Sequence, residues 1–394
     1  MRLLLAVAIG GAPLTLLANG LRLASQDAFA TARGEAFAAT VDNPSAIYYN
    51  PAGIAQLDGI GLRGGFYGIY YDPSFTPPPP ANTNHFHLEN KLAGVPQLFA
   101  TYASGTSPLS FGAGVYAPFG GGVSWPQDTG FRAVATEASL TYLTFNPVVA
   151  LKLAPSLSLA AGLTVNYANI SLEQGLLRTE TPFANHFRFS GDGWSAGYNL
   201  GVLWRPHANL SFGAAFRSSS LVTMKGHTEI EQQPIIGATE RDAQADFTFP
   251  WIAVVGVSWR PTPKWNLEFD ADCTDWRSFD TVTIQQESAP FPVRQNVPVT
   301  LEWQTSWMYK FGVTRYFDNH WHISAGYVFS ENSVPDDYYS PLAADMDRHF
   351  IGAGLGRRGR RYDFDVAYQF GYGPPHTVTG STPSSTPGRF VGQR

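Results

Sequence analysis

Several long segments of this chain alternate between apolar residues and small or polar ones. In residues 157–167 the odd positions are apolar or aromatic, whereas Ser158 and Asn166 lie among the even ones. The same alternation recurs in 194–204, 265–272 and 361–372. A period of two is typical of β-strands whose two faces meet different surroundings. The pattern therefore predicts an all-β protein.

The apolar face of these strands is expected to point outward, toward lipid. The alternating runs approach the ~10 residues that a tilted strand needs to cross a bilayer. Aromatic residues such as Trp194 and Trp204 lie at their ends, as in the aromatic belts of membrane interfaces. In a soluble sandwich the apolar face points inward and strands are usually shorter. We therefore expect a transmembrane antiparallel β-barrel with a polar lumen.

The composition agrees with a membrane barrel. Only 14% of the 394 residues are charged, compared with about a quarter in soluble domains. No apolar run reaches the roughly 20 residues that a membrane-spanning helix needs. Composition alone leaves a soluble all-β protein as the alternative. The net charge of −5 and the absence of a basic cluster argue against nucleic acid as a partner, and Cys273 alone cannot form a disulfide framework.

Turns and loops alternate in length along the predicted barrel domain, residues 60–373. Short turns, two of them at Trp-Arg-Pro sequences, alternate with long loops such as 73–93 and 229–242, as expected for periplasmic turns and external loops. Thirteen strands can be counted, whereas single-chain bacterial barrels normally have an even number. We therefore expect 374–394 to be an external loop before a missing last strand. A miscounted strand near the start is the alternative.

The first part of the chain is predicted to lie outside the barrel wall. Residues 1–18 resemble a signal peptide, with Arg2 before the apolar stretch Leu3–Leu17 and cleavage between 18 and 20. Residues 19–59 contain an Asn- and Pro-rich segment, whose side chains and fixed φ angles suit irregular backbone. We interpret 19–59 as a plug inside the lumen.

A break is predicted in the strand around Pro118, Phe119 and Gly120. Proline cannot donate to the hydrogen-bond ladder, and glycines follow it directly. Within a barrel wall such a break leaves a neighbouring carbonyl without a partner, so it needs a compensating contact or an opening. One interpretation is that the strand simply ends there. The other is a kinked strand that forms a lateral gate.

No catalytic, metal or cofactor site is expected from the side-chain chemistry. His85 and His87 flank Phe86 on a long loop, where we interpret them as ordinary polar residues. Glu268, Asp270 and Asp272 share one strand face and are interpreted as solvated lumen carboxylates, with paired acids as the alternative. The glycines at 120–122 follow no buried parallel strand and open no helix, so they are not a phosphate loop.

Four sequence motifs resemble the FadL/TodX-type (OmpP1/FadL) family of outer-membrane transporters for long-chain fatty acids and other hydrophobic compounds. They occur in the same order as in that family and extend over most of the chain. They are Asn50-Pro51-Ala52, Phe145-Asn146-Pro147-Val148-Val149-Ala150, Ser330-Glu331-Asn332-Ser333-Val334-Pro335-Asp336 and Asp347-Arg348-His349. The resemblance implies a fourteen-stranded barrel with a plug, and release of the ligand sideways into the membrane. The chain departs from the family in lacking the last strand.

The resemblance also implies a function without catalysis, namely uptake of hydrophobic compounds, most of all long-chain fatty acids. The outer-membrane lipid and the barrel assembly machinery are the other expected partners. Two alternatives are a diffusion porin for small polar solutes and an outer-membrane lipid hydrolase. The plug and the few lumen charges disfavour the first, and the absence of a Ser or His pair disfavours the second.

Three groups of residues are predicted to serve transport. Asn50, Pro51 and Ala52 would form a hatch that holds the plug closed, with a plain turn before the first strand as the alternative. Pro118, Phe119 and Gly120 would form the lateral-gate kink. Aromatic residues of the external loops would capture the ligand first; these are Phe119, Phe131 and Phe183.

Overall fold

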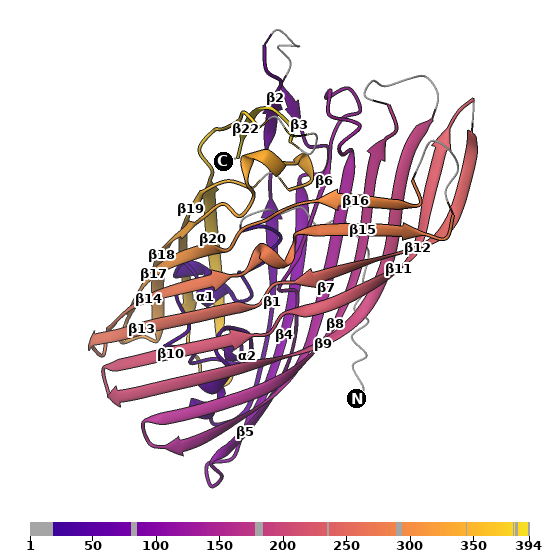
Figure 1. Cartoon of the computed structure of the whole chain (residues 1–394). Helices are drawn as coiled ribbons and strands as arrows, with labels where there is room; N and C mark the ends of the chain where they lie inside the picture. The colour runs from indigo at the N-terminus through magenta and orange to yellow at the C-terminus, as the bar shows by residue number, and fades with distance from the viewer. Residues whose placement is uncertain are drawn as a thin grey trace, which may run out of the picture.

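The computed structural model describes residues 19–79, 85–177, 184–234, 236–288, 294–343, 345–380, 382 and 385–392. Most of them belong to one large, strongly curved antiparallel sheet (Figure 1). Phe183 and the predicted signal peptide, 1–18, lie outside the described residues. No helix in the described part is both long and apolar enough to span a membrane.

The helices of the described residues are short, and three of the six lie near the N-terminus. They are α1 (Ala28–Ala32), α2 (Ala46–Tyr49), η1 (Pro51–Gln56), η2 (Trp276–Ser278), η3 (Asp336–Tyr338) and η4 (Pro341–Ala343). The large sheet contains β1 (Gly59–Tyr70), β4 (Leu92–Ala103), β5 (Leu109–Tyr116), β6 (Gly120–Ser124), β7 (Glu137–Ala154), β8 (Leu157–Gly175), β9 (Asn185–His207), β10 (Leu210–Arg217), β11 (Ser220–Gln232), β12 (Ile236–Phe249), β13 (Ile252–Thr262), β14 (Trp265–Thr274), β15 (Thr281–Gln286), β16 (Asn296–Thr300), β17 (Ser306–Tyr316), β18 (Trp321–Ser330), β19 (Arg348–Arg357) and β20 (Phe364–Tyr372).

Short breaks divide five traversals of the large sheet into two strands each. The divided traversals are β5/β6, β10/β11, β12/β13, β14/β15 and β16/β17. The eighteen strands of this sheet therefore make thirteen traversals within the described ranges, each antiparallel to the next. This is the number that the alternating pattern predicts.

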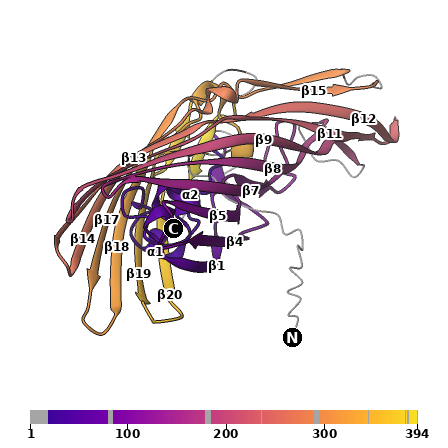
Figure 2. The same ribbon diagram turned by 90° about the horizontal axis from the view of Figure 1, so that it is seen from below.

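The first and last traversals, β1 and β20, are joined by side chains that point to the inner face. Arg63 of β1 lies 2.7 Å from Asp365 of β20, and the Tyr67 hydroxyl donates to Gln369 across 3.0 Å. Figure 2 shows β1 and β20 next to each other beside the N-terminal helices.

A second, small sheet lies at the end of the molecule opposite the short turns (Figure 1). It consists of β2 (Ser74–Thr76), β3 (Phe86–His87), β21 (His376–Val378) and β22 (Gly388–Val391), in the order β21-β22-β2-β3. Part of the segment predicted as an external loop, 374–394, thus pairs with the first long loop.

The outer face of the large sheet is apolar and its inner face is buried. Leu163 is 66% exposed, whereas its neighbour Thr164 is 3% exposed. The same contrast separates Tyr198 from Asn199. A soluble sandwich would bury the apolar set instead, so the outward orientation predicted for the apolar face is confirmed.

The inner face differs between its two halves, which corrects the prediction of a polar lumen throughout. Near the short turns it is polar and contacts the N-terminal segment. Toward the small sheet it is lined by one continuous apolar cluster that includes Phe249, Trp276 and Phe75. At some of the breaks the parity of the inward-facing positions reverses, which contributes to this change. In β12 the odd positions, such as Phe247, are buried, whereas in β13 the inward positions are even, such as Ile252.

Candidate functional site

Residues 19–57 lie on the inner face of the sheet and are almost entirely buried. The short helix α1 begins at Asp27, whose side chain accepts from the Ala30 N–H across 3.1 Å. Capping by Asp satisfies one of the free donors of a helix start. Helix η1 begins in the same way at Asn50, with Pro51 in its first turn, where a missing N–H costs nothing.

Glycines on the inner face of the large sheet, which forms the wall around residues 19–57, let this segment lie directly on the backbone of the strands. A Cβ at Gly312 or Gly326 would collide with Arg33 or Gly34, and one at Gly352 would collide with the carbonyl of Thr31. Glycine is needed wherever another backbone approaches a strand so closely. The wall is therefore shaped for residues 31–34.

Three acidic residues of β14 hold the segment through charge and hydrogen bonds. Asp272 binds Arg22 and lies 2.7 Å from Lys310. Asp270 accepts from two consecutive backbone N–H groups, at residues 37 and 38, both across 2.8 Å. Glu268 accepts from Arg33 and from the backbone of residues 39 and 40. All three carboxylates are buried, so the prediction that they are solvated is wrong: the segment takes the place of water.

The charges of the segment itself are set by the same burial. Burial alone lowers the pKa of the Arg22 guanidinium, but the Asp272 carboxylate outweighs this and leaves the pKa above its ordinary value. Burial raises the pKa of the Tyr49 phenol well above its usual range, and Glu35 and Asp27 nearby raise it further. Arg22 is therefore charged and Tyr49 is a neutral hydrogen-bonding group.

Asn50 joins the segment to the wall. Its Nδ2 donates to the Ala38 carbonyl across 2.8 Å and to the carbonyl of Val202 in β9 across 2.9 Å. Its Oδ1 accepts from the Ala52 N–H across 3.2 Å. A Cβ at Gly201 would collide with Asn50 and with the Ala52 nitrogen. Asn50, Pro51 and Ala52 are thus buried against the inner wall and not at a water-facing turn.

The wall is broken at Ala117, Pro118 and Phe119, and the strand resumes beyond them as β6. Both halves pair with β7, whereas β4 is in register with β5 and with β1 and not with β6 among the described residues. The strand therefore does not end at Pro118, and a window without ladder hydrogen bonds separates β4 from β6.

Residues 21–26 of the N-terminal segment fill this window. The Leu23 N–H donates to the Pro118 carbonyl and the Gly120 N–H donates to the Leu21 carbonyl, both across 2.9 Å. The Gln26 amide donates to the Ala117 carbonyl across 2.7 Å. These bonds satisfy the groups that the break leaves free, as buried backbone requires.

Two tyrosines connect the window to Asn50. The Tyr48 hydroxyl donates to the Leu23 carbonyl across 3.1 Å, and the Tyr49 hydroxyl donates to the Ala24 carbonyl across 3.2 Å. The Gln26 N–H donates to the Tyr49 hydroxyl across 3.0 Å. Tyr48 and Tyr49 are the last two residues of α2, and Asn50 follows them. The window residues 23–26 are therefore in contact with the part of the segment that leads into Asn50.

Two cavities lie on either side of Leu21 and Arg22. The first is apolar, has a volume of about 70 Å³ and is lined by Leu21, Phe249 and Trp303 among others. The second, of about 30 Å³, is lined by Arg22, Tyr48 and Arg217 among others. An apolar space with a few convergent polar groups is the usual form of a ligand site.

Arg217, at the end of β10, differs from the other cations of the second cavity. Its guanidinium lies over the rings of Tyr48 and Tyr116, 5.3 and 5.1 Å from their centroids, and donates to the Tyr116 hydroxyl across 2.7 Å. Arg22 and Lys310 both bind Asp272. Within the described ranges Arg217 forms no ion pair with a carboxylate.

The aromatic residues predicted for ligand capture occupy buried positions. Phe119 packs against Tyr142, Phe249 and Trp276. Phe131 packs between Phe75 and Trp125. Both belong to the apolar cluster of the inner face. Phe183 lies outside the described residues.

The two loop histidines are held by different partners. His85 hydrogen-bonds Thr76 across 2.8 Å and His87 pairs with Asp72 at 3.0 Å.

The sequence did not point to Arg217, or to Tyr48 and Tyr49, as part of the site. The only signal for Arg217 is a charged residue at the inward end of an otherwise apolar strand.

Comparison with known proteins places this geometry in a family. The family model described as outer membrane protein transport protein (OMPP1/FadL/TodX) matches residues 12–385. The chain belongs to this family. It is 22% identical to a long-chain fatty acid transport protein of Escherichia coli O6:H1 over 362 residues, covering 80% of this chain and 78% of that one.

Solved structures of FadL-family proteins share the fold. A Pseudomonas aeruginosa FadL homologue superposes with a TM-score of 0.81 at 17% identity, covering 95% of this chain and 97% of the other. The Pseudomonas putida toluene transporter TodX superposes with a TM-score of 0.71 at 14% identity, covering 97% of both chains. The protein is thus an outer-membrane protein with the FadL-family β-barrel fold.

Proposed function

We propose that the chain transports long-chain fatty acids across the outer membrane, with its sheet closed around residues 19–57 as a plug. The observation that carries this proposal is the pair of cavities at Leu21 and Arg22. The lining of the first cavity is apolar, as an alkyl chain requires, and with its volume of about 70 Å³ the cavity has to widen to hold a whole fatty acid. Arg217, which lines the second cavity, is a cation without a carboxylate partner among the described residues. A toluene transporter such as TodX needs no such cation for its ligand.

The exit of such a ligand has to be lateral. Transfer of a 16-carbon chain out of water is favourable by on the order of 10 kcal/mol, at ~0.8 kcal/mol per CH₂. A ligand bound in an apolar cavity will therefore not leave readily into the aqueous periplasm. The window between β4 and β6 opens toward lipid, where the free energy of the alkyl chain is low.

The contacts suggest how binding opens the window. A carboxylate on Arg217 competes with Tyr48 and Tyr116 for the guanidinium. Tyr48 also holds the Leu23 carbonyl, and Leu23 binds Pro118. A shift of Tyr48 thus loosens residues 21–26 from the break, while Asn50 and Ala52 act as the hatch that keeps α2 in place. The ligand favours the open arrangement only through its higher affinity for it.

Uptake measurements on Arg217→Gln test this function. In cells lacking their own fatty acid transporters, we expect the wild-type chain to take up labelled palmitate but no labelled sugar. Arg217→Gln should lower palmitate uptake about tenfold, equivalent to ~1.4 kcal/mol, and leave uptake of the methyl ester unchanged. Sugar uptake by the wild-type chain would show a polar diffusion pore instead. An equal loss for acid and ester would remove Arg217 as the carboxylate site.

A further inference from the structure

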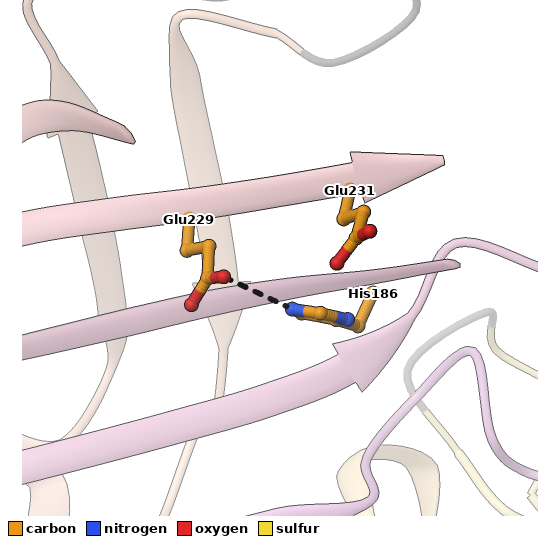
Figure 3. Close-up of side chains that lie close together, drawn as sticks. All are labelled: His186, Glu229 and Glu231. Atoms are coloured by element: carbon orange, nitrogen blue, oxygen red, sulfur yellow. Dashed lines mark ion pairs between the residues drawn. The ribbon is translucent and has the colours of Figure 1, made fainter. Parts of the chain in front are cut away.

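Three side chains with metal-binding groups meet on the outer face of β9 and β11. They are His186 of β9 and Glu229 and Glu231 of β11, whose ligand atoms all lie within 4.8 Å of one another (Figure 3). Their neighbours Phe187 and Ile230 point the other way, into the buried apolar cluster. The group is therefore separate from both cavities, and its side chains are partly exposed on the outer face of the sheet.

The register of the two strands brings these residues together. Glu231 lies directly opposite His186, and Glu229 lies opposite Arg188. Because side chains alternate along a strand, Glu229 and Glu231 share one face. The position is beyond the aromatic pair Tyr167 and Trp194, whose ring centroids are 5.0 Å apart, on the side of the small sheet. It thus lies outside the membrane, where an ion has access from water.

His186 is the least satisfied member of the group. Its Nε2 is buried and has no hydrogen-bond partner within the described residues, and it lies 3.8 Å from an oxygen of Glu229. A nitrogen that faces a carboxylate beyond hydrogen-bond distance, with a second carboxylate alongside, leaves space for an ion between the three groups.

Neighbouring residues orient both carboxylates through one oxygen each. Arg188 Nη1 lies 3.5 Å from Oε2 of Glu229, while Oε1 of Glu229 faces His186. The Gln233 amide donates to Oε1 of Glu231 across 2.6 Å. Such outer contacts are typical of residues that hold metal ligands in position. A purely ionic network of Glu173, Arg188 and Glu229 does not explain why Glu231 and the His186 nitrogen, which has no hydrogen-bond partner among the described residues, face the same point.

We propose that His186, Glu229 and Glu231 bind one divalent transition-metal ion, of which Zn²⁺ is the best fit. Imidazole nitrogen and carboxylate oxygen together suit Zn²⁺, whereas Ca²⁺ and Mg²⁺ prefer oxygen ligands alone. Three protein ligands leave a further position to water. The ion would link β9 to β11 where both strands extend beyond the membrane.

Equilibrium dialysis with Zn²⁺ alone tests the proposal on the full, tag-free chain in detergent. We expect one equivalent of Zn²⁺ to bind to the wild-type protein. His186→Ala and Glu231→Gln should each weaken binding at least about tenfold, the lower end of what outer-contact changes alone produce. His227→Ala is the matched control, because His227 also faces outward from β11 but has a single carboxylate, Glu240, at 3.8 Å.

A second measurement separates binding from misfolding. Zn²⁺ should raise the thermal midpoint of the wild-type protein and of His227→Ala but not of His186→Ala, since only a folded state with the site gains from the ion. The proposal is overturned if the wild-type protein binds no zinc, if His186→Ala binds it as well as wild type, or if an equal concentration of Ca²⁺ displaces it.

Discussion

At the scale of single residues, Asn50 ties the N-terminal segment to the inner face of the sheet. Its amide bonds to backbone on both sides, at Ala38 and Val202, and Gly201 provides the space. A buried amide that loses its partners costs about 1–3 kcal/mol. A ligand that opens the proposed hatch has to offset a cost of this size through its higher affinity for the open arrangement.

Substitution from either side of this contact should impair the hatch. We expect Gly201→Ala in the wall and Ala52→Leu in the segment each to change uptake of labelled fatty acid by about tenfold, or ~1.4 kcal/mol. Both variants should still be assembled at normal surface abundance. Gly105→Ala is the control, because a Cβ there meets nothing within 4 Å. Normal uptake in both variants would leave Asn50-Pro51-Ala52 as a turn without a gating role.

At the scale of strands, the two faces of β8 should respond differently to charge. Leu163 is 66% exposed on the outer face and Ser158 is 8% exposed on the inner face. Leu163→Lys should destabilise the barrel by about 2–4 kcal/mol if it lies near the membrane midplane, and Ser158→Lys by much less. Urea unfolding in lipid vesicles measures both. Equal losses would contradict the orientation of the strand.

Not every inward polar residue tolerates such a change. Asn199 donates to the Ile47 carbonyl and bonds with Asn146, and Asp365 binds Arg63 and His322. From the strand pattern alone, a charge at Asn199 or Asp365 is expected to be as mild as at Ser158. Their buried partners make both positions sensitive, which periodicity cannot reveal.

The carboxylates of β14 are expected to anchor residues 19–57 to the sheet. Asp272→Asn leaves Arg22 and Lys310 without their shared partner, and breaking a buried ion pair typically costs about 3–5 kcal/mol. We expect residues 19–57 to become cleavable by trypsin at Arg22 or Arg33 while the strands stay resistant. Asp318→Asn, at an exposed ion pair with Lys264, is the control. Protection equal to wild type would mean that β14 does not anchor the segment.

The strand pattern predicted much of the fold, because period two and outward apolar residues are local properties. It did not predict the apolar half of the inner face. At Pro250 and Trp251 the inward positions change from odd to even, so Phe247 and Phe249 follow the opposite parity from Ile252. The change is missed when either the odd or the even positions are assumed to face inward along both β12 and β13. The proline at the break is the sequence signal that marks the change.

At the scale of the whole molecule, the candidate site arises from contacts between distant parts of the chain. The motif Asn50-Pro51-Ala52 and the break at Pro118 are visible in the sequence. The tyrosines that join them are not, since Tyr48 and Leu23 are brought together only by the packing of residues 19–57 against the wall. Arg217 of β10 contacts Tyr48 as well.

The bonds of Tyr48 and Tyr49 to residues 23–26 have a thermodynamic consequence. Sites that share a contact chain respond non-additively, with interaction energies of about 0.5–3 kcal/mol. Gln26→Ala at the window and Ala52→Leu at the hatch should therefore show such an interaction in fatty acid uptake. Replacing both tyrosines by Phe should abolish it, because the hydroxyls that carry the bonds are then absent. An interaction that persists in the Phe background would mean that the two ends communicate through the wall.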